Sequence, residues 1–383
     1  MDEQVPPSGI DERSSEASYQ QLARLLAQQI VSRELAAGSR LPQERELSQL
    51  HHVSRFTVRN ALDVLEAQGL IERVRGKGTF VTGGSAEKRW FSMASTILFV
   101  FVGATRANQV PAGGFYGEIY AGIKQAARTL GLQLKTEGIR SYVRVSLDEY
   151  RPPKPSEIGG VIVCGSFDEQ YIRMFGSEGV PVVAVDLWSH DPQVDSVVVD
   201  VESDAYGAID HLAEKGHASA GFFAIGRQER GSDLYDYDPD IWRLLDNLRR
   251  AAQRRRIEFR EEWIRLAQGS RMQPQLVARD LLSLRDRPTS LITFDAAAAL
   301  PVLKAMESLG LRCPEDISVI TRGDSAVAGR LATSFVGDPA MMGRQAVRLL
   351  VERIQGQRQR AVKVAVTTRL VLGETTGPAP QHT

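Results

Sequence analysis

From residue 95 onwards, short apolar runs alternate with amphipathic stretches, and this alternation constrains the fold more than any other feature of the chain. The runs at 97–102 and 160–164 are apolar at nearly every position, which is typical of strands buried on both faces. Stretches of helical spacing, such as 116–130, separate them. The pattern predicts an α/β fold whose parallel sheets are covered by helices on both sides.

The length of this part, residues 95–376, predicts two lobes that share one cleft, because a single hydrophobic core stops growing at about 250–300 residues. We expect lobe 1 to comprise residues 95–200 and 326–355, and lobe 2 to comprise residues 201–325 and 356–376. The other predicted segments are a disordered tail at 1–17, a small helical domain at 18–82, a linker at 83–94 and a second tail at 377–383.

Residues 18–82 show three stretches of helical spacing and then two short β-prone runs. Gly38 ends the first stretch, and Ser54 is a suitable N-cap for the third. The β-prone runs at 70–74 and 79–82 are joined by a tip rich in glycine and positive charge. Three helices followed by a basic hairpin predict a winged helix.

Two arginines near the start of the third predicted helix favour a DNA-reading role. Arg55 and Arg59 are four residues apart and therefore share one helix face, with Phe56 and Thr57 beside them. A helix that enters the major groove with its N-terminus first brings such side chains to base edges and phosphates. Arginine also bonds guanine through two hydrogen bonds. A solvated surface charge is the alternative interpretation for any single arginine here.

The segment LPQERELSQLHHVSRFTVRNALDVLEAQGLIERVRGKGTFV resembles the DNA-binding domain of the gluconate-repressor (GntR) family, and the likeness covers residues 19–81. It implies a winged helix-turn-helix that binds a palindromic operator in double-stranded DNA. Phe56 departs from the small polar residue often found at its position, which leaves the operator sequence open. The predicted DNA-contacting residues are Arg45, Ser54, Arg55, Phe56, Thr57, Arg59, Arg75, Gly76 and Lys77.

The segments GVPVVAVDLW, SVVVDVESDAYGAIDHLAEKGH and FVGDPAMMGRQAVRLLVERIQGQ resemble the effector domain of the LacI/GalR family, which is itself similar to periplasmic sugar-binding proteins. The combination of the two modules is similar to regulators of the arabinose-repressor type. It implies a transcription regulator, expected to be a repressor, that forms a homodimer through its sensing domains. A small-molecule effector, expected to be a sugar or sugar derivative, would bind between the two lobes.

Polar side chains at strand ends are expected to line the effector crevice, because open α/β sheets bind ligands there. Aromatic side chains nearby are expected to stack on a sugar ring, and the resemblance assigns Arg243 to ligand hydroxyls. The predicted ligand-binding residues are Phe115, Tyr116, Asp186, Trp188, Arg243, Asp295 and Asp324.

Several of the acidic residues also fit purely structural roles. Asp204 and Asp295 are consistent with helix N-caps, and Asp200 with a structural position at a strand end. Arg322 departs from the residues usual in the family and adds a positive charge near the predicted cleft. An acidic sugar or sugar phosphate is therefore a hypothesis beside a neutral sugar.

Composition limits the other function classes. Lys+Arg and Asp+Glu balance at 47 each, so net charge does not indicate a polyanion partner. The N-terminus lacks the basic start and apolar core of an export signal, and the run at 97–102 is too short to span a bilayer, so we expect a cytoplasmic protein without a membrane partner. Cys164 and Cys313 are expected to be buried thiols. Without GxSxG, HExxH, CxxC or a phosphate-binding loop, the sequence predicts no enzyme activity, cofactor or metal site.

Overall fold

The computed structural model describes residues 18–31, 34–36, 38–67, 70–74, 77–82, 96–102, 111–139, 157–165, 169–176, 179–228, 235–236, 239–268, 273–355, 357–358 and 360–381. The predicted tail at 1–17, the predicted linker at 83–94, and Arg75 and Gly76 of the predicted wing tip lie outside these residues. Among the described helices, none is both long and apolar enough to cross a membrane.

The N-terminal domain has the predicted winged-helix plan. Its elements are α1 (Ser18–Val31), α2 (Glu44–Leu50), α3 (Arg55–Ala67) and the antiparallel hairpin of β1 (Ile71–Val74) and β2 (Gly78–Val81). Leu22, Leu62 and Leu65 are among the fully buried side chains of its core. The Ser54 hydroxyl accepts a hydrogen bond from the Thr57 amide at 3.0 Å, so Ser54 is the N-cap of α3 as predicted.

Lobe 1 is built on a six-stranded sheet whose order is β16-β7-β6-β5-β3-β4, and all of its strand pairs are parallel. Side chains alternate along β3: Ile97 and Phe99 pack against α5 and α11, and Leu98 and Val100 pack on the face covered by α6. The elements are β3 (Thr96–Val102), α5 (Gly114–Thr129), β4 (Gln133–Ile139), β5 (Gly160–Cys164), α6 (Glu169–Gly176), β6 (Val182–Val185), β7 (Asp195–Val199), α11 (Pro339–Ile354) and β16 (Lys363–Val366).

Lobe 2 is built on a second sheet, of order β10-β8-β11-β12-β15-β17, with β9 paired to β8. Helices α7 and α8 cover one face and α9 and α10 the other. The edge strands β9 and β17 run antiparallel to their neighbours, and the other pairs are parallel. The elements are α7 (Val201–Glu214), β8 (Gly221–Gln228), β9 (Tyr235–Asp236), α8 (Pro239–Arg255), η1 (Glu261–Trp263), β10 (Ile264–Gln268), α9 (Pro274–Leu282), β11 (Ser290–Thr293), α10 (Ala296–Ser308), β12 (Ser318–Arg322), β13 (Ala326–Val327), β14 (Arg330–Leu331), β15 (Thr333–Val336) and β17 (Arg369–Val371).

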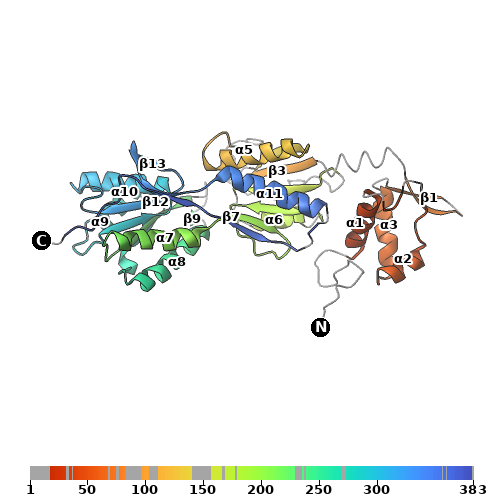
Figure 1. Ribbon diagram of the computed structural model, residues 1–383, viewed down its shortest axis with the longest axis horizontal. Helices are drawn as coiled ribbons and strands as arrows, with labels where there is room; N and C mark the ends of the chain where they lie inside the picture. The colour runs from red at the N-terminus through yellow and green to blue at the C-terminus, as the bar shows by residue number, and fades with distance from the viewer. Residues whose placement is uncertain are drawn as a thin grey trace.

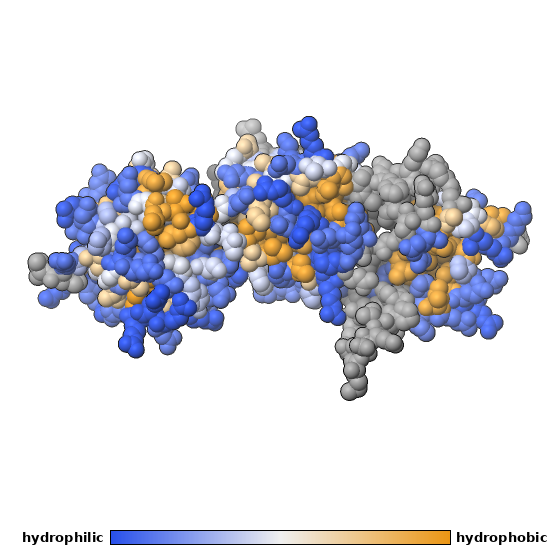
Figure 2. All heavy atoms as spheres, viewed as in Figure 1, coloured by the Kyte–Doolittle hydropathy of each residue, from blue (hydrophilic) through white to orange (hydrophobic). Residues whose placement is uncertain are grey.

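The chain passes between the two lobes three times. The crossovers join β7 to α7, β15 to α11, and β16 to β17, and Figure 1 shows the two sheets side by side with these segments running between them. Figure 2 shows apolar residues among the polar ones on the visible face of lobe 1.

The predicted division of the C-terminal segments between the lobes is wrong in two places. The segment 326–336 belongs to lobe 2, because β15 pairs with β12, whereas β16 at 363–366 belongs to lobe 1, because it pairs with β7. The predicted tail at 377–383 is also partly built into lobe 2. Gly377 is buried and its amide donates to the Ser318 hydroxyl at 3.0 Å.

Two glycines allow α5 and α11 to cross closely beside the cleft. A Cβ atom on Gly122 would overlap the carbonyl of Ala340, and one on Gly343 would overlap the carbonyl of Ile119. The backbones of the two helices therefore touch where α5 and α11 begin to line the space between the lobes.

We predict that Gly343→Ala destabilises the protein by about 1–3 kcal/mol, because the added methyl forces two backbones apart in a packed core. Gly176→Ala is the matched control, since a Cβ there meets nothing within 4 Å. Urea unfolding followed by circular dichroism measures both variants. Equal stability of the two would contradict the close crossing.

Candidate DNA interface and effector cavity

The start of α3 presents the predicted DNA-reading side chains to solvent. Arg55 and Phe56 are exposed, and Phe56 retains 72% of its accessible surface. Thr57 is half-buried, and its hydroxyl lies 2.8 Å from that of Ser54. A phenylalanine this exposed adds nothing to the core of the domain, so the apolar surface that it offers is available to a partner.

The two arginines on this face of α3 differ in their partners. Arg59 forms an ion pair with Glu44 of α2 at 3.2 Å, and the hydrogen bond to Glu44 raises the pKa of Arg59 above its ordinary value. Arg45, next to Glu44, is exposed. Because exposed ion pairs contribute little free energy, a phosphate can replace Glu44 as the partner of Arg59.

At the described end of the wing, Lys77 is exposed and Gly78 has a φ of +118°. The positive φ favours glycine here, whereas the nearby guanidinium of Arg40, 2.7 Å from a Cβ placed on Gly78, is the end of a flexible side chain that can move.

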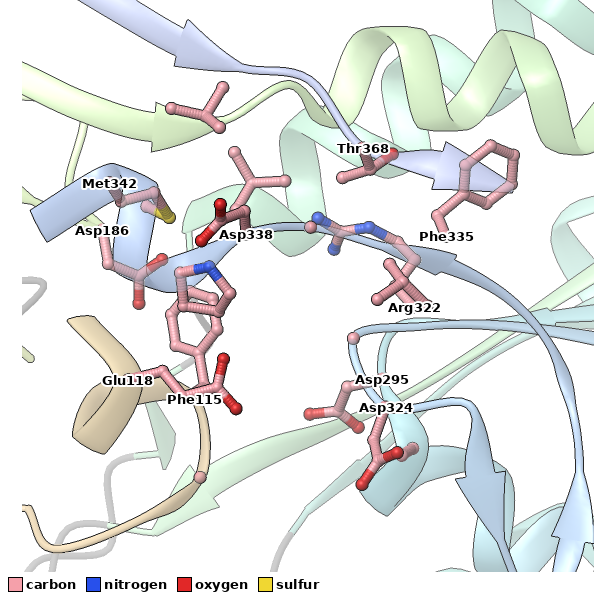
Figure 3. A pocket seen from close by; sticks show the side chains of 18 of the residues that line it. Phe115, Glu118, Asp186, Asp295, Arg322, Asp324, Phe335, Asp338, Met342 and Thr368 are labelled. Atoms are coloured by element: carbon pink, nitrogen blue, oxygen red, sulfur yellow. The ribbon is translucent and has the colours of Figure 1, made fainter. Parts of the chain in front are cut away.

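A cavity of about 490 Å³ lies between the lobes, at the carboxyl ends of the strands of both sheets. Five of the seven predicted ligand-binding residues line it: Phe115, Tyr116, Asp186, Asp295 and Asp324. Figure 3 shows Asp295 and Asp324 beside each other on lobe 2, and Phe115, Glu118 and Asp186 across the cavity on lobe 1. The second crossover supplies a third side of the cavity, through Asp338 and its neighbours.

On the lobe 1 side, an aromatic group meets a carboxylate. The Tyr116 hydroxyl donates to Oδ2 of Asp186 at 2.8 Å, and the Tyr116 ring lies edge-on to Phe115 with centroids 5.3 Å apart. Asp186 follows β6 with a φ of +62°, a left-handed conformation that side chains other than glycine adopt at a cost. An aromatic face beside a carboxylate suits a ring that carries hydroxyl groups.

On the lobe 2 side, the two aspartates hold loop backbone and face the cavity. Asp295 caps α10 by accepting the Ala298 amide at 2.8 Å, and Asp324 accepts the Ala326 amide at 2.9 Å. The N-cap interpretation of Asp295 is therefore confirmed, and the residue lines the cavity as well. The N-cap interpretation of Asp204 is wrong, because Asp200 caps α7 by accepting the Ser203 amide.

Trp188 and Arg243 are the two predicted ligand-binding residues that are not among the described lining residues. They contact each other instead. The Arg243 guanidinium lies 4.6 Å from the centroid of the Trp188 ring, and its Nη1 bonds Asp240 at 2.7 Å. Trp188 follows β6 in lobe 1 and Arg243 belongs to α8 in lobe 2, so the pair joins the lobes, and one face of the indole is already covered.

Sequence reasoning did not include Arg322 among the ligand-binding residues, yet it is the arginine that lines the cavity. Its Nε donates to Oδ2 of Asp204 at 2.7 Å, and the hydroxyl of Thr368 in the third crossover donates to Oδ1 of Asp204. Asp204 is 1% exposed. The positive charge predicted near the cleft is therefore already compensated, which removes the reason given for an acidic ligand.

Comparison with known proteins assigns a family to each module. Residues 18–81 match the bacterial regulatory proteins of the gntR family, and residues 209–376 match the periplasmic binding protein-like domain.

Curated relatives share the sequence over long stretches. The chain is 24% identical over 351 residues to an arabinose metabolism transcriptional repressor of Geobacillus stearothermophilus, which covers 88% of this chain and 91% of that protein. It is 26% identical over 225 residues to the HTH-type transcriptional repressor MelR of Bacillus subtilis, covering 58% of this chain and 64% of that protein.

Solved structures share the fold. The transcriptional regulator CelR in complex with cellobiose superposes with a TM-score of 0.60 at 20% identity, covering 88% of this chain and all of that one. A LacI family regulator from Enterococcus faecium with bound ribose gives a TM-score of 0.56 at 16% identity, covering 74% of this chain and 99% of that one.

The family that residues 18–81 match consists of bacterial regulatory proteins, and the curated relatives are named as transcriptional repressors rather than enzymes. This chain joins a helix-turn-helix that matches the gntR family to a periplasmic binding protein-like domain, which has the fold of the LacI family regulators.

We predict that Asp186→Gly is more stable than Asp186→Ala by about 1 kcal/mol, although both lose the bond to Tyr116, because glycine relieves the left-handed strain and alanine keeps it. Thermal unfolding of the two variants beside the wild type measures the difference. An alanine variant at least as stable as the glycine variant would show that the backbone here is unstrained.

Proposed function

We propose that this protein is a dimeric transcriptional repressor whose affinity for a palindromic operator is set by a sugar or sugar derivative bound between its two lobes. The observation that carries the proposal is a cavity lined by both lobes and by the crossovers between them, in the same chain as a helix-turn-helix with exposed polar and basic side chains. Because the cavity wall comes from both lobes, an occupant that contacts both changes their relative position.

For the DNA contacts, we propose that the start of α3 enters the major groove. Arg55 and Phe56 would reach base edges, with Arg59 and Thr57 on phosphates or neighbouring bases. Phosphate contacts by Arg45 and Lys77 would fix the register of the domain on the duplex. The predicted contacts at Ser54, Arg75 and Gly76 complete the set; the last two lie outside the described residues.

For the effector, we propose a polyhydroxyl ligand held by Asp186, Asp295 and Asp324, with Phe115 and Tyr116 against its ring. Relatives and structural neighbours named for arabinose, cellobiose and ribose support the sugar class.

For the assembly, we propose a homodimer formed through the sensing domains. Two DNA-binding domains that bind one palindromic operator together increase the affinity, and the distance between them fixes the half-site spacing. The apolar residues on the visible face of lobe 1 offer a surface for a second copy (Figure 2). Movement of the lobes would change the separation of the two DNA-binding domains. The coupling free energy between effector binding and operator binding would then be about 1–3 kcal/mol.

The test begins by selecting preferred sequences from random DNA duplexes with the purified protein and measuring affinity by fluorescence anisotropy. We predict that Arg55→Ala weakens binding to the selected operator at least tenfold, because a bidentate base contact is worth about 1–3 kcal/mol in each half-site.

The matched control is Arg312→Ala, an exposed arginine of lobe 2 paired with Asp316, which should leave operator affinity unchanged. Selection that yields no preferred sequence, or an Arg55 variant with wild-type affinity, would reject the proposed reading helix.

A further inference from the structure

We propose that Arg322, rather than Arg243, is the guanidinium that binds the effector, and that its ion pair with Asp204 makes the site select an uncharged polyhydroxyl ligand over an anionic one. This inference rests on the proposed function, because it takes the cavity between the lobes as the effector site. It adds the chemical class of the ligand and the pair of residues that sets it.

The positions of the two arginines decide which one meets a ligand. Arg322 ends β12, lines the cavity and is only 9% exposed, and Figure 3 shows its guanidinium below Thr368, pointing towards the side of the cavity that holds Asp338. Arg243 is occupied by Asp240 and by the ring of Trp188. A ligand in the cavity therefore meets the guanidinium of Arg322, and it would have to break two contacts to recruit Arg243.

The Arg322 guanidinium is held so that only part of its donor set remains for a ligand. Nε is used by Asp204, Nη1 makes a long contact of 3.5 Å to the Phe294 carbonyl, and the group lies 5.2 Å from the Phe294 ring centroid. No hydrogen bond found among the described residues uses Nη2. The Nη groups are thus fixed donors for a ligand oxygen, such as a hydroxyl or a ring oxygen.

Asp204 supplies the opposite charge from a site that a ligand cannot reach. It is buried beneath Arg322 on α7, and the hydroxyl of Thr368 fixes its second oxygen. The Asp204 carboxylate forms an ion pair with the guanidinium and so offsets its charge at short range. Arg322 therefore acts toward the cavity as a set of hydrogen-bond donors with little net charge.

The rest of the described lining adds negative charge. Six carboxylates contribute to it, of which Asp240 is paired with Arg243 and Asp338 with Arg344. The other four are Glu118, Asp186, Asp295 and Asp324, and Arg322 is the only basic residue among the described lining residues. A bound carboxylate or phosphate would be repelled by these carboxylates, and the one basic group in the described lining is already paired with Asp204. Hydroxyl groups, in contrast, donate to the carboxylates and accept from Arg322, so a neutral polyol satisfies both kinds of partner.

The variant that tests the charge is Asp204→Asn. The amide has the same shape, its oxygen can still accept from Nε of Arg322, and its N–H can donate to the Thr368 hydroxyl. The substitution removes the compensating charge and leaves the cavity lining unchanged, so it should shift the preference toward anions.

Isothermal titration measures wild type and D204N against neutral sugars and their charged counterparts. The neutral probes are arabinose, ribose, glucose, galactose and cellobiose, and the anionic ones are gluconate, glucuronate, galacturonate, glucose 6-phosphate and ribose 5-phosphate. We expect the wild type to bind at least one neutral probe at least tenfold more tightly than the tightest-binding anionic probe, and D204N to reduce that ratio at least tenfold. An anion preferred by the wild type, no binding of any neutral probe, or an unchanged ratio in folded D204N would overturn the proposal.

A second pair of variants decides the matter if D204N does not fold. R322Q should lower the affinity for the neutral probe at least tenfold, whereas R243Q, which changes the neighbouring arginine in the same way, should change it less than threefold. The reverse order would assign the ligand to Arg243 and overturn the proposal. Operator selection does not depend on these measurements, so failure here is distinguishable from failure of the proposed DNA-binding function.

Discussion

The three passages of the chain between the lobes are the constraint on which the rest of the structure depends. Each sheet takes strands from both sides of a crossover: β16 completes lobe 1 after β15 has been added to lobe 2, and β17 returns to lobe 2. Neither lobe is therefore a separate segment of sequence. The crossovers also form part of the wall of the cavity, through Val336, Asp338 and Thr368, so a ligand touches the segments about which the lobes can move.

Burial decides which charged side chains at the cavity a ligand can contact. Asp204 is covered by Arg322 and Thr368. Most of the carboxylates that face the cavity use an oxygen for a local partner, such as the Tyr116 hydroxyl for Asp186 or the Ala298 amide for Asp295. The site therefore offers fixed acceptors and one fixed donor group. Such preorganisation lowers the entropy lost when a ligand with many hydroxyl groups binds.

Much of this could be predicted from the sequence where the signals are local. Helical periodicity, the Ser54 cap and a glycine-rich hairpin together predict the winged helix. The apolar run at 97–102 predicts that β3 is buried on both faces of its sheet. Sheet membership at the C-terminus could not be predicted in this way. β16 pairs with β7, more than a hundred residues earlier in the chain, and no local signal shows that the chain stays in lobe 2 through β15 before it crosses to α11. Asp204 looked like a helix cap because its partner Arg322 is 118 positions distant. Nothing in the local sequence around Arg243 reveals that Trp188 covers it.

The central claim is that a ligand bound in the cavity changes the affinity of the protein for DNA. Because the two binding equilibria are linked, the effect can be measured either as a change in operator affinity or as a change in sugar affinity. If a neutral sugar changes operator affinity by some factor, the operator must change sugar affinity by the same factor. The most direct measurement is titration of the sugar into the protein alone and into its complex with the selected operator. The account predicts dissociation constants that differ by about fivefold or more, in agreement with the change in operator affinity. Identical constants for the free and the DNA-bound protein would contradict it.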